Sequence, residues 1–260
     1  MQANTARRQR SSYNKLTAER EVESIMEAAV ECPEGASPAD KEQAPVPVFI
    51  LGLSRSGKSL AKSLLGSQAG VFAAGESEHW QRLNRAAMKN GPHETTAARL
   101  GTAYREQMHR LAGAAEYFVS TLDSNILSLA GIAAALPEAR FVLCLREPVD
   151  NALLIYFKRY EQGHEHAYDF CDIADFMAQR VRLQAHWRDL LGERSITLEY
   201  EKMVQGAAAT GEKIATHVGL EFDTSRALPN FHGNEIAMWK SYEKHLDPLH
   251  AALAQYRENK

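Results

Sequence analysis

The residue pattern with the clearest chemical meaning is a glycine-rich segment, residues 52–59, which ends in Gly57, Lys58 and Ser59. The apolar run before it, residues 48–51, is typical of a buried strand, and the residues after it are typical of a helix. Glycines let the backbone turn tightly, so that several N–H groups and the positive end of the helix face one anion. Lys58 can reach a phosphate oxygen, and Ser59 can donate a hydrogen bond or hold a metal. The segment therefore predicts a phosphate-binding loop.

Short apolar runs that predict strands alternate along the chain with segments that have helical spacing. The predicted strands are residues 48–51, 71–74, 117–121, 141–145 and 196–200, and the main predicted helices are residues 60–65, 78–89, 95–112, 126–136 and 172–191, with a last one ending at 218. This alternation predicts an α/β fold of the P-loop type, with three layers, α/β/α, and a central parallel sheet. Ligands bind beyond the carboxyl ends of parallel strands. One crevice is therefore expected to be lined by residues 52–59, 75–76, 121–124 and 146–147.

Residues 1–46 differ from the rest of the chain and are expected to form a helical arm and a linker. Helical spacing of apolar residues runs from Leu16 to Ala29, and residues 33–47 are rich in Pro, Ala, Glu and Asp. The main domain is expected at residues 47–260. The arm can pack against this domain or contact a second copy in a homodimer, and the sequence leaves both possibilities open.

The composition is that of a globular protein and disfavours several classes of partner. Hydrophobic residues make up 45% of the 260 residues and charged residues 24%. The net charge of −3 gives no general attraction to nucleic acid or to an acidic membrane, so an anion site must be local. No segment is long and apolar enough to span a membrane, and the N-terminus shows no secretory signal. Three scattered cysteines suit a reducing compartment, and a cytoplasmic location is expected.

Several blocks of the chain resemble, in order, the sulfotransferases that use 3′-phosphoadenosine 5′-phosphosulfate (PAPS), in particular the bacterial branch related to tyrosylprotein sulfotransferases. Residues 47–59 resemble the 5′-phosphosulfate loop of that family, residues 72–76 its Gly-Glu segment, and residues 141–156 its 3′-phosphate block. Further similar landmarks lie at residues 186–187, 198–201 and 239–246. Together these blocks extend over residues 47–250.

The resemblance implies transfer of a sulfuryl group from PAPS to a hydroxyl or amine of a small-molecule or carbohydrate-like acceptor, without a metal. Arg146 would hold the 3′-phosphate, which a guanidinium can bind through two parallel hydrogen bonds. Glu76 stands where the tyrosylprotein branch has its catalytic base, and it would take the proton of the acceptor. The 5′-phosphosulfate would be held by the loop residues Arg55, Ser56, Gly57, Lys58, Ser59 and Leu60.

The chain departs from the family at positions that serve the 3′-phosphate and the leaving group. Leu154 stands in place of a serine, and Val149 in place of the second arginine of the block. The family has a catalytic lysine just after the third strand, but the aligned residues 119–124 contain no lysine. Our hypothesis is that Lys58, as a second catalytic residue, supplies the missing positive charge from within the loop.

Two other interpretations stay open at the level of sequence. The spacing of residues 52–59 also fits a phosphotransferase that uses ATP and Mg²⁺, with Asp123 or Glu147 as the acid that holds the metal. Alternatively, a non-catalytic protein that binds a nucleotide or an anion on a degenerate sulfotransferase fold would account for the missing lysine and serine. A requirement for Mg²⁺ separates the phosphotransferase from the sulfotransferase.

Histidines, acids and cations are concentrated in residues 158–172, but their spacing fits no zinc site. Residues 164–172 are expected to form a solvated loop. Lys158 and Arg159, together with Tyr156 and Tyr160, could form a patch that binds phosphate or the acceptor. The two cations are instead expected on a helix surface, with their aliphatic parts on the protein and their charges in water.

Overall fold

The computed structural model describes residues 2–28, 45–90, 96–228 and 235–257. At its centre is one five-stranded sheet in the order β2-β3-β1-β4-β5, in which every neighbouring pair of strands is parallel. The strands are β1 (Val46–Gly52), β2 (Val71–Gly75), β3 (Tyr117–Ser120), β4 (Arg140–Leu145) and β5 (Ser195–Glu199). The predicted α/β fold with a central parallel sheet is confirmed.

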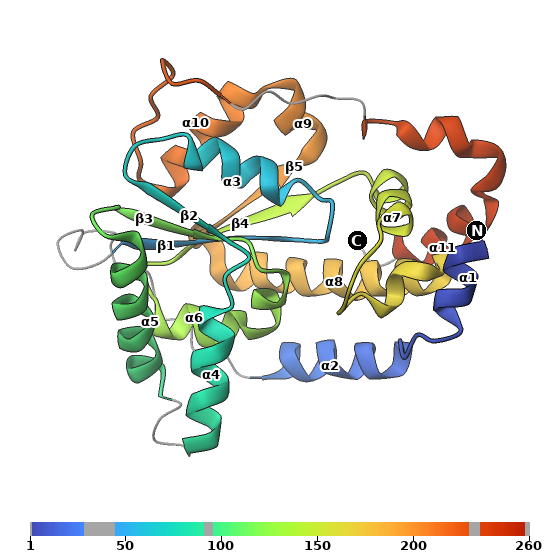
Figure 1. Cartoon of the computed structure of the whole chain (residues 1–260), viewed down its shortest axis with the longest axis horizontal. Helices are drawn as coiled ribbons and strands as arrows, with labels where there is room; N and C mark the ends of the chain where they lie inside the picture. The colour runs from blue at the N-terminus through green and yellow to red at the C-terminus, as the bar shows by residue number, and fades with distance from the viewer. Residues whose placement is uncertain (1, 29–44, 91–95, 229–234, 258–260) are drawn as a thin grey trace.

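Helices cover both faces of the sheet, as Figure 1 shows. One face is covered by α3 (Lys58–Gly66), α9 (Tyr200–Gln205) and α10 (Ala207–Val218). The other is covered by α4 (His79–Asn90), α5 (Ala97–Ala112), α6 (Leu129–Ala135) and α8 (Phe170–Leu191). The remaining α-helices are α1 (Gln2–Arg8), α2 (Lys15–Glu27), α7 (Pro148–Phe157) and α11 (Asp247–Arg257), and the 3₁₀ segments are η2 (Asp123–Ser128), η3 (Glu165–Tyr168), η4 (Gly192–Arg194) and η6 (Met238–His245).

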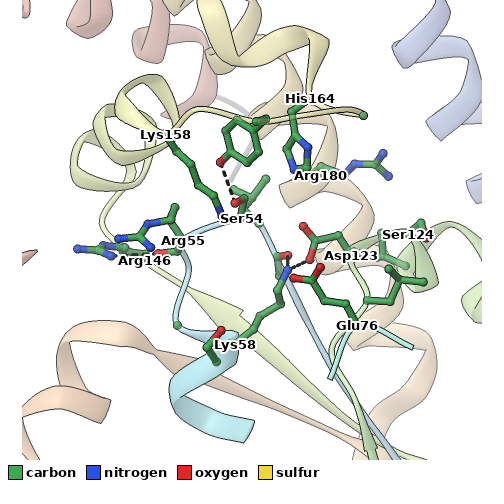
Figure 2. Close-up of a pocket in the computed structure, with 18 of the residues that line it drawn as sticks. Ser54, Arg55, Lys58, Glu76, Asp123, Ser124, Arg146, Lys158, His164 and Arg180 are labelled. Carbon is green, nitrogen blue, oxygen red and sulfur yellow. Dashed lines mark hydrogen bonds and ion pairs between the residues drawn. The ribbon is translucent and has the colours of Figure 1, made fainter. Parts of the chain in front are cut away.

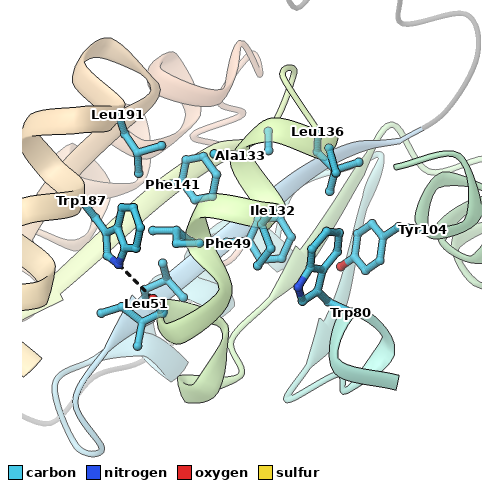
Figure 3. Packing of buried hydrophobic residues seen from close by; sticks show 14 of the residues in the cluster. Phe49, Leu51, Trp80, Tyr104, Ile132, Ala133, Leu136, Phe141, Trp187 and Leu191 are labelled. Atoms are coloured by element: carbon cyan, nitrogen blue, oxygen red, sulfur yellow. Dashed lines mark hydrogen bonds between the residues drawn. The ribbon is translucent and has the colours of Figure 1, made fainter. Parts of the chain in front are cut away.

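The central strand β1 is apolar throughout because both faces of the sheet are covered. Its residues alternate between two cores: Phe49 and Leu51 pack with Trp80 and Trp187, whereas Val48 packs on the side of α3 and α10. Figure 3 shows the first of these cores, in which Trp187 Nε1 donates a hydrogen bond of 2.9 Å to the backbone oxygen of Ile126. The buried core anchors the carboxyl end of β1, from which the glycine-rich loop starts.

Two of the predicted helices are interrupted in the structure. The segment 126–136 begins in the tighter 3₁₀ helix η2 and continues as α6. The helical segment that ends at Val218 is divided into α9 and α10 at Gly206, whose φ of −141° lies outside the helical region. The predicted linker lies largely outside the described residues, since residues 29–44 are not among them.

The N-terminal arm packs on the main domain of its own chain. Helix α2 lies along α8, as Figure 1 shows, and Val22 of α2 is only 2% exposed in this contact. Arg8 forms an ion pair of 2.5 Å with Asp172 at the start of α8. Of the two roles expected for the arm, packing on the main domain is the one that the structure of the single chain shows; contact with a second copy is not tested by it. In the described ranges no helix combines the length and the apolar character needed to cross a membrane.

Candidate active site

The glycine-rich loop leaves the carboxyl end of β1 between β3 and β4, the two neighbours of this strand. In open α/β sheets this position, where the order of strands reverses, is where ligands bind. Gly57 has a φ of +100°, and a Cβ atom there would lie 2.6 Å from Met203 Cε. Arg55 also has a positive φ, 68°, which is uncommon without a glycine. The loop thus has a tight, specified backbone that only glycine permits at Gly57.

The loop presents hydrogen-bond donors that fit a phosphate or sulfate. The backbone N–H groups of Gly57, Lys58 and Ser59 donate to no protein acceptor within the described residues, as expected at the start of helix α3. The Ser56 hydroxyl is buried and likewise has no partner there. The Ser56 hydroxyl lies against Gly52, whereas the three N–H groups lie at the positive end of α3, so the loop fits the 5′-phosphosulfate group of PAPS or the phosphates of another nucleotide.

Lys58 is the buried cation of the loop, with 8% of its surface exposed. Its Nζ donates a hydrogen bond of 3.0 Å to the backbone oxygen of Gly52 and forms an ion pair with Asp123. Burial lowers the pKa of Lys58 to about 8, whereas the nearby carboxylate of Glu76 acts to raise it. The ion pair with Asp123 also favours the charged ammonium. Lys58 is therefore a cation whose charge depends on two carboxylates.

Those two carboxylates follow the ends of neighbouring strands. Glu76 follows β2, and Asp123 follows β3; the two strands run side by side in the sheet. In Figure 2 both side chains lie beside the ammonium of Lys58. A carboxylate at this place faces the cavity in front of the loop, where it can accept a proton from a bound hydroxyl.

Arg146 lies at the end of β4 and is held by several groups of the protein. Its guanidinium stacks on the ring of Tyr200, 3.9 Å from the centroid, and donates to the backbone oxygen of Arg55 at 3.0 Å. It also donates to the backbone oxygen of Glu235 at 2.7 Å and to the carboxylate of Glu235 at 3.2 Å. The same carboxylate binds Arg55 at 2.5 Å. Glu235 therefore occupies the anion position that Arg55 and Arg146 create together. The buried Arg146 Nε has no hydrogen-bond partner among the described residues.

The two family positions that the chain has changed contribute no polar group here. Both Leu154 and Val149 lie in α7 and are buried, with 8% and 3% of their surface exposed. Asp150, in the same helix, is buried as well, and its carboxylate accepts hydrogen bonds from the backbone of Ala237 and Trp239 at 2.6 and 2.9 Å. The 3′-phosphate block thus ties the chain segment after Glu235 to the end of β4.

The loop, the carboxylates and Arg146 line one cavity of about 1360 Å³. Its other wall is the connection between α7 and α8, seen at the top of Figure 2 with Lys158, His164 and, from α8, Arg180. Tyr160 ties this wall to the loop through a hydrogen bond of 2.8 Å from its hydroxyl to Ser54 Oγ. The cavity is large enough for a nucleotide and a second, smaller molecule, since drug-sized ligands occupy roughly 300–1,000 Å³.

Two expectations for this wall are wrong. Lys158 and Arg159 do not lie on a helix surface, because α7 ends at Phe157 and both cations line the cavity. The predicted solvated loop contains His166, which is buried and stacked on Phe176 at 3.6 Å between ring centroids. The second error arises because α1 and α8 pack on η3, a segment that is polar in sequence.

The structure brings together most of the residues that the sequence singled out. Seven of the predicted site residues line the cavity: Arg55, Gly57, Lys58, Ser59, Leu60, Glu76 and Arg146. The eighth, Ser56, belongs to the loop but is buried. Sequence reasoning missed Glu235 and Arg180 as parts of the site. Asp123 was expected to line the crevice as part of residues 121–124 and was considered as a metal-holding acid, but its pairing with Lys58 was not predicted. In the described ranges, no group of three or more His, Cys, Asp or Glu side chains is placed to hold a metal ion.

Comparison with known proteins identifies the family. A profile described as the sulfotransferase family matches residues 47–224 of the chain. The chain belongs to the sulfotransferase family. This sulfotransferase is similar in fold to the sulfotransferase domain of the Synechococcus PCC 7002 olefin synthase, at 18% identity and a TM-score of 0.56, over 88% of this chain and 91% of that one. A sulfotransferase from Alicyclobacillus acidocaldarius has 14% identity and a TM-score of 0.51, over 82% of this chain and 99% of that one.

A curated relative comes from Aquifex aeolicus (strain VF5) and is described as an uncharacterized protein. It is 23% identical to the sulfotransferase over 78% of this chain. The match covers 31% of the relative, so the chain spans about a third of the length of that protein.

Proposed function

We propose that this sulfotransferase transfers a sulfuryl group from PAPS to a hydroxyl or amine of a small-molecule or carbohydrate-like acceptor. The observation that carries the proposal is the meeting, in one cavity, of the phosphate-binding loop with two carboxylates beside its buried lysine. Bound PAPS would supply an activated sulfuryl group whose transfer is an in-line displacement between two oxygens. Such reactions depend on positioning and on stabilisation of negative charge.

The loop residues would position the donor. The free N–H groups of Gly57, Lys58 and Ser59 would bind the 5′-phosphosulfate, together with the hydroxyl of Ser56. The ammonium of Lys58 would stabilise the negative charge that develops on the leaving phosphate, in place of the lysine that the family has after its third strand. Its burial makes this charge effective, because few water molecules screen it.

Glu76 would act as the base that takes the acceptor proton. It is exposed to the cavity and lies close enough to Lys58 to influence its pKa, so an acceptor between them would meet both groups. Asp123, by contrast, is already paired with Lys58. This difference favours Glu76 as the base and Asp123 as the group that keeps Lys58 charged.

Arg146 would bind the 3′-phosphate once the carboxylate of Glu235 has left it. Its guanidinium is fixed by Tyr200 and by the backbone of Arg55, so the side chain is already oriented toward the anion position. Arg55 shares this position and would contribute a second cation.

The nucleotide preference of the purified protein tests the proposal. Thermal unfolding is measured with the product nucleotide 3′-phosphoadenosine 5′-phosphate (PAP), and separately with ATP in the presence and absence of Mg²⁺. A ligand that binds only the folded state raises the midpoint, by ~2.7 kcal/mol of stability at a hundred times its Kd. We expect a shift with PAP that Mg²⁺ does not change. A shift only with ATP and Mg²⁺ would contradict the proposal in favour of a phosphotransferase.

Transfer itself is tested by following the release of PAP from PAPS in the presence of candidate acceptors. Lys58→Ala and Glu76→Gln are expected to lower the rate by at least a hundredfold each, as is usual for a charge-stabilising group or a general base. A protein that binds PAP but releases none from PAPS with any acceptor would instead be a non-catalytic nucleotide-binding protein.

A further inference from the structure

Arg180 is a cation of the cavity wall that forms no ion pair with a carboxylate of the described residues. It lies on α8, on the side of the cavity away from Arg146, as Figure 2 shows. Its Nη1 is buried and makes no hydrogen bond, and in the described part of the chain no carboxylate forms an ion pair with it. The same side chain also lines a smaller cavity of about 260 Å³ between α8 and the N-terminal arm. Arg180 is therefore a charged donor that faces space on more than one side.

The surroundings of Arg180 are aromatic and make its charge costly. Its guanidinium carbon lies 4.9 Å from the centroid of Phe176, and the ring of Phe176 also stacks on His166. Burial lowers the pKa of Arg180, and Glu21 of the arm acts to raise it. Burial also lowers the pKa of His166 to about 3, so this neighbour is neutral at pH 7. A guanidinium remains charged in proteins, and a desolvated charge without a counter-ion costs free energy.

Two buried arginines elsewhere in the described residues, Arg146 and Arg194, do have protein partners for their guanidinium groups. Arg146 binds the carboxylate of Glu235 and two backbone oxygens. Arg194 donates to the backbone oxygens of Ala133, Leu136 and Ala139. Within the part of the chain that the structure describes, Arg180 has neither a carboxylate in an ion pair nor a backbone oxygen as hydrogen-bond partner, which distinguishes it from a cation such as Arg194 that serves the fold alone and indicates that an anion completes its environment.

We propose that the acceptor carries a carboxylate and that Arg180 binds it. This inference rests on the proposed function, because it assigns the nucleotide to the loop and the acceptor to the rest of the cavity. Apolar side chains of Leu122, Ile126 and Phe176 line the cavity on this side and suit a hydrocarbon or aromatic spacer. The substrate class is therefore a hydroxy-carboxylic acid, with its hydroxyl toward Glu76 and its carboxylate against the guanidinium. The planar fork of arginine matches a carboxylate through two parallel hydrogen bonds.

Binding to the PAP complex tests this inference without turnover. The probes are a graded series of ω-hydroxyalkanoic and hydroxyphenylalkanoic acids, each paired with its primary amide, titrated by calorimetry into protein saturated with PAP. At least one acid is expected to bind about tenfold more tightly than its amide, since a charge-assisted hydrogen bond is worth ~1.5 kcal/mol or more. Arg180→Gln should abolish this preference, and Arg180→Lys should retain part of it.

The matched control is Arg188→Gln, which changes an exposed arginine of the same helix that lines neither cavity. It should leave the preference for the acid intact. Equal binding of acid and amide, or no binding of any acid to a protein that binds PAP, overturns the inference alone. Absence of PAP binding overturns the proposed function instead. If Arg180→Gln does not fold, the comparison of acid and amide on the unaltered protein still decides the question.

Discussion

At the scale of single residues, Lys58 decides how the loop responds to pH. Its ammonium is desolvated by burial, which favours the neutral amine, and it is paired with Asp123, which favours the charged form. Only the charged form attracts the phosphosulfate. The loop can therefore lose its affinity for anions in a pH range in which an ordinary lysine, with a pKa of roughly 10.4, is still fully charged.

We predict that PAP affinity falls as the pH rises through about 8, the lowered pKa of Lys58. The sign follows from the charge: the ammonium is present below its pKa and is lost above it. Asp123→Asn removes the carboxylate that favours the charged form, so the midpoint should move to lower pH. Calorimetric titration across the pH range measures both midpoints. Lys62→Gln, in the same helix but outside the cavity, should leave the midpoint unchanged, and a midpoint near the ordinary lysine value would contradict the prediction.

The loop could be predicted from sequence, whereas most of its partners could not. The spacing of glycine, lysine and serine is local, and it determines a strand, a turn and a helix within a few residues. The pairing of Lys58 with Asp123, and of Arg146 with Glu235, joins residues far apart in the chain. Such contacts depend on how strands are ordered in the sheet. A polar residue in sequence also carries no sign of its burial, which is why Arg180 and His166 were missed.

At the scale of elements, the strands were predicted well because each is a short apolar run bounded by polar or glycine residues. All five predicted strands overlap β1 to β5 within a few residues. The order β2-β3-β1-β4-β5 was not predicted, because hydrophobic pattern gives the buried face of a strand but not its neighbours. The boundary between η2 and α6 was not predicted, because the two elements share one apolar periodicity although their hydrogen bonding differs.

The N-terminal arm is the element that holds the acceptor wall of the cavity. Arg7 in α1 donates hydrogen bonds of 2.9 Å to the backbone oxygen of Tyr160 and to the hydroxyl of Tyr168. Asn4 donates to the backbone oxygen of Tyr156 at 2.9 Å, and Ser11 to that of Glu165 at 2.7 Å. These bonds run from the arm to the connection between α7 and α8. The arm therefore supports the segment that we assign to the acceptor.

We predict that Arg7→Gln loosens residues 158–168 and raises the KM for the acceptor, while the Kd for PAP stays the same. Two hydrogen bonds worth ~1 kcal/mol each are weakened, so amide hydrogen exchange in this segment should become about tenfold faster. Mass spectrometry of exchange and steady-state kinetics measure the two effects. Arg10→Gln, at an exposed position just beyond α1, is the control. A rise in the Kd for PAP as large as the rise in KM would show that the arm acts on the whole domain.

At the scale of the whole molecule, the cavity is built from segments of the N-terminal, central and C-terminal parts of the chain. The cations of the nucleotide side are paired within the protein: Asp123 pairs with Lys58, and Glu235 pairs with Arg55 and Arg146. Asp150 fixes the segment that follows Glu235 by accepting hydrogen bonds from its backbone. A protein with a net charge of −3 thereby keeps a local group of cations, of which Lys58 and Arg146 are buried. An anionic ligand must replace a carboxylate of the protein to reach Arg146.

This competition predicts that Glu235→Gln binds PAP more tightly than the unaltered protein. The carboxylate of Glu235 is 35% exposed, so its ion pairs are partly screened, and we expect a gain of about threefold to tenfold, or ~1 kcal/mol. The ligand-free variant should unfold at a lower temperature, because Arg146 loses its counter-charge, and PAP should restore more stability to it than to the original. Calorimetry measures the affinity, and thermal unfolding measures the stability. The control is Glu243→Gln in η6, a segment that does not line the cavity. Weaker binding by Glu235→Gln would contradict the prediction and would show that the carboxylate orients the two guanidinium groups for the nucleotide. In that case the loss of the carboxylate would lower both the stability of the folded protein and its affinity for the donor.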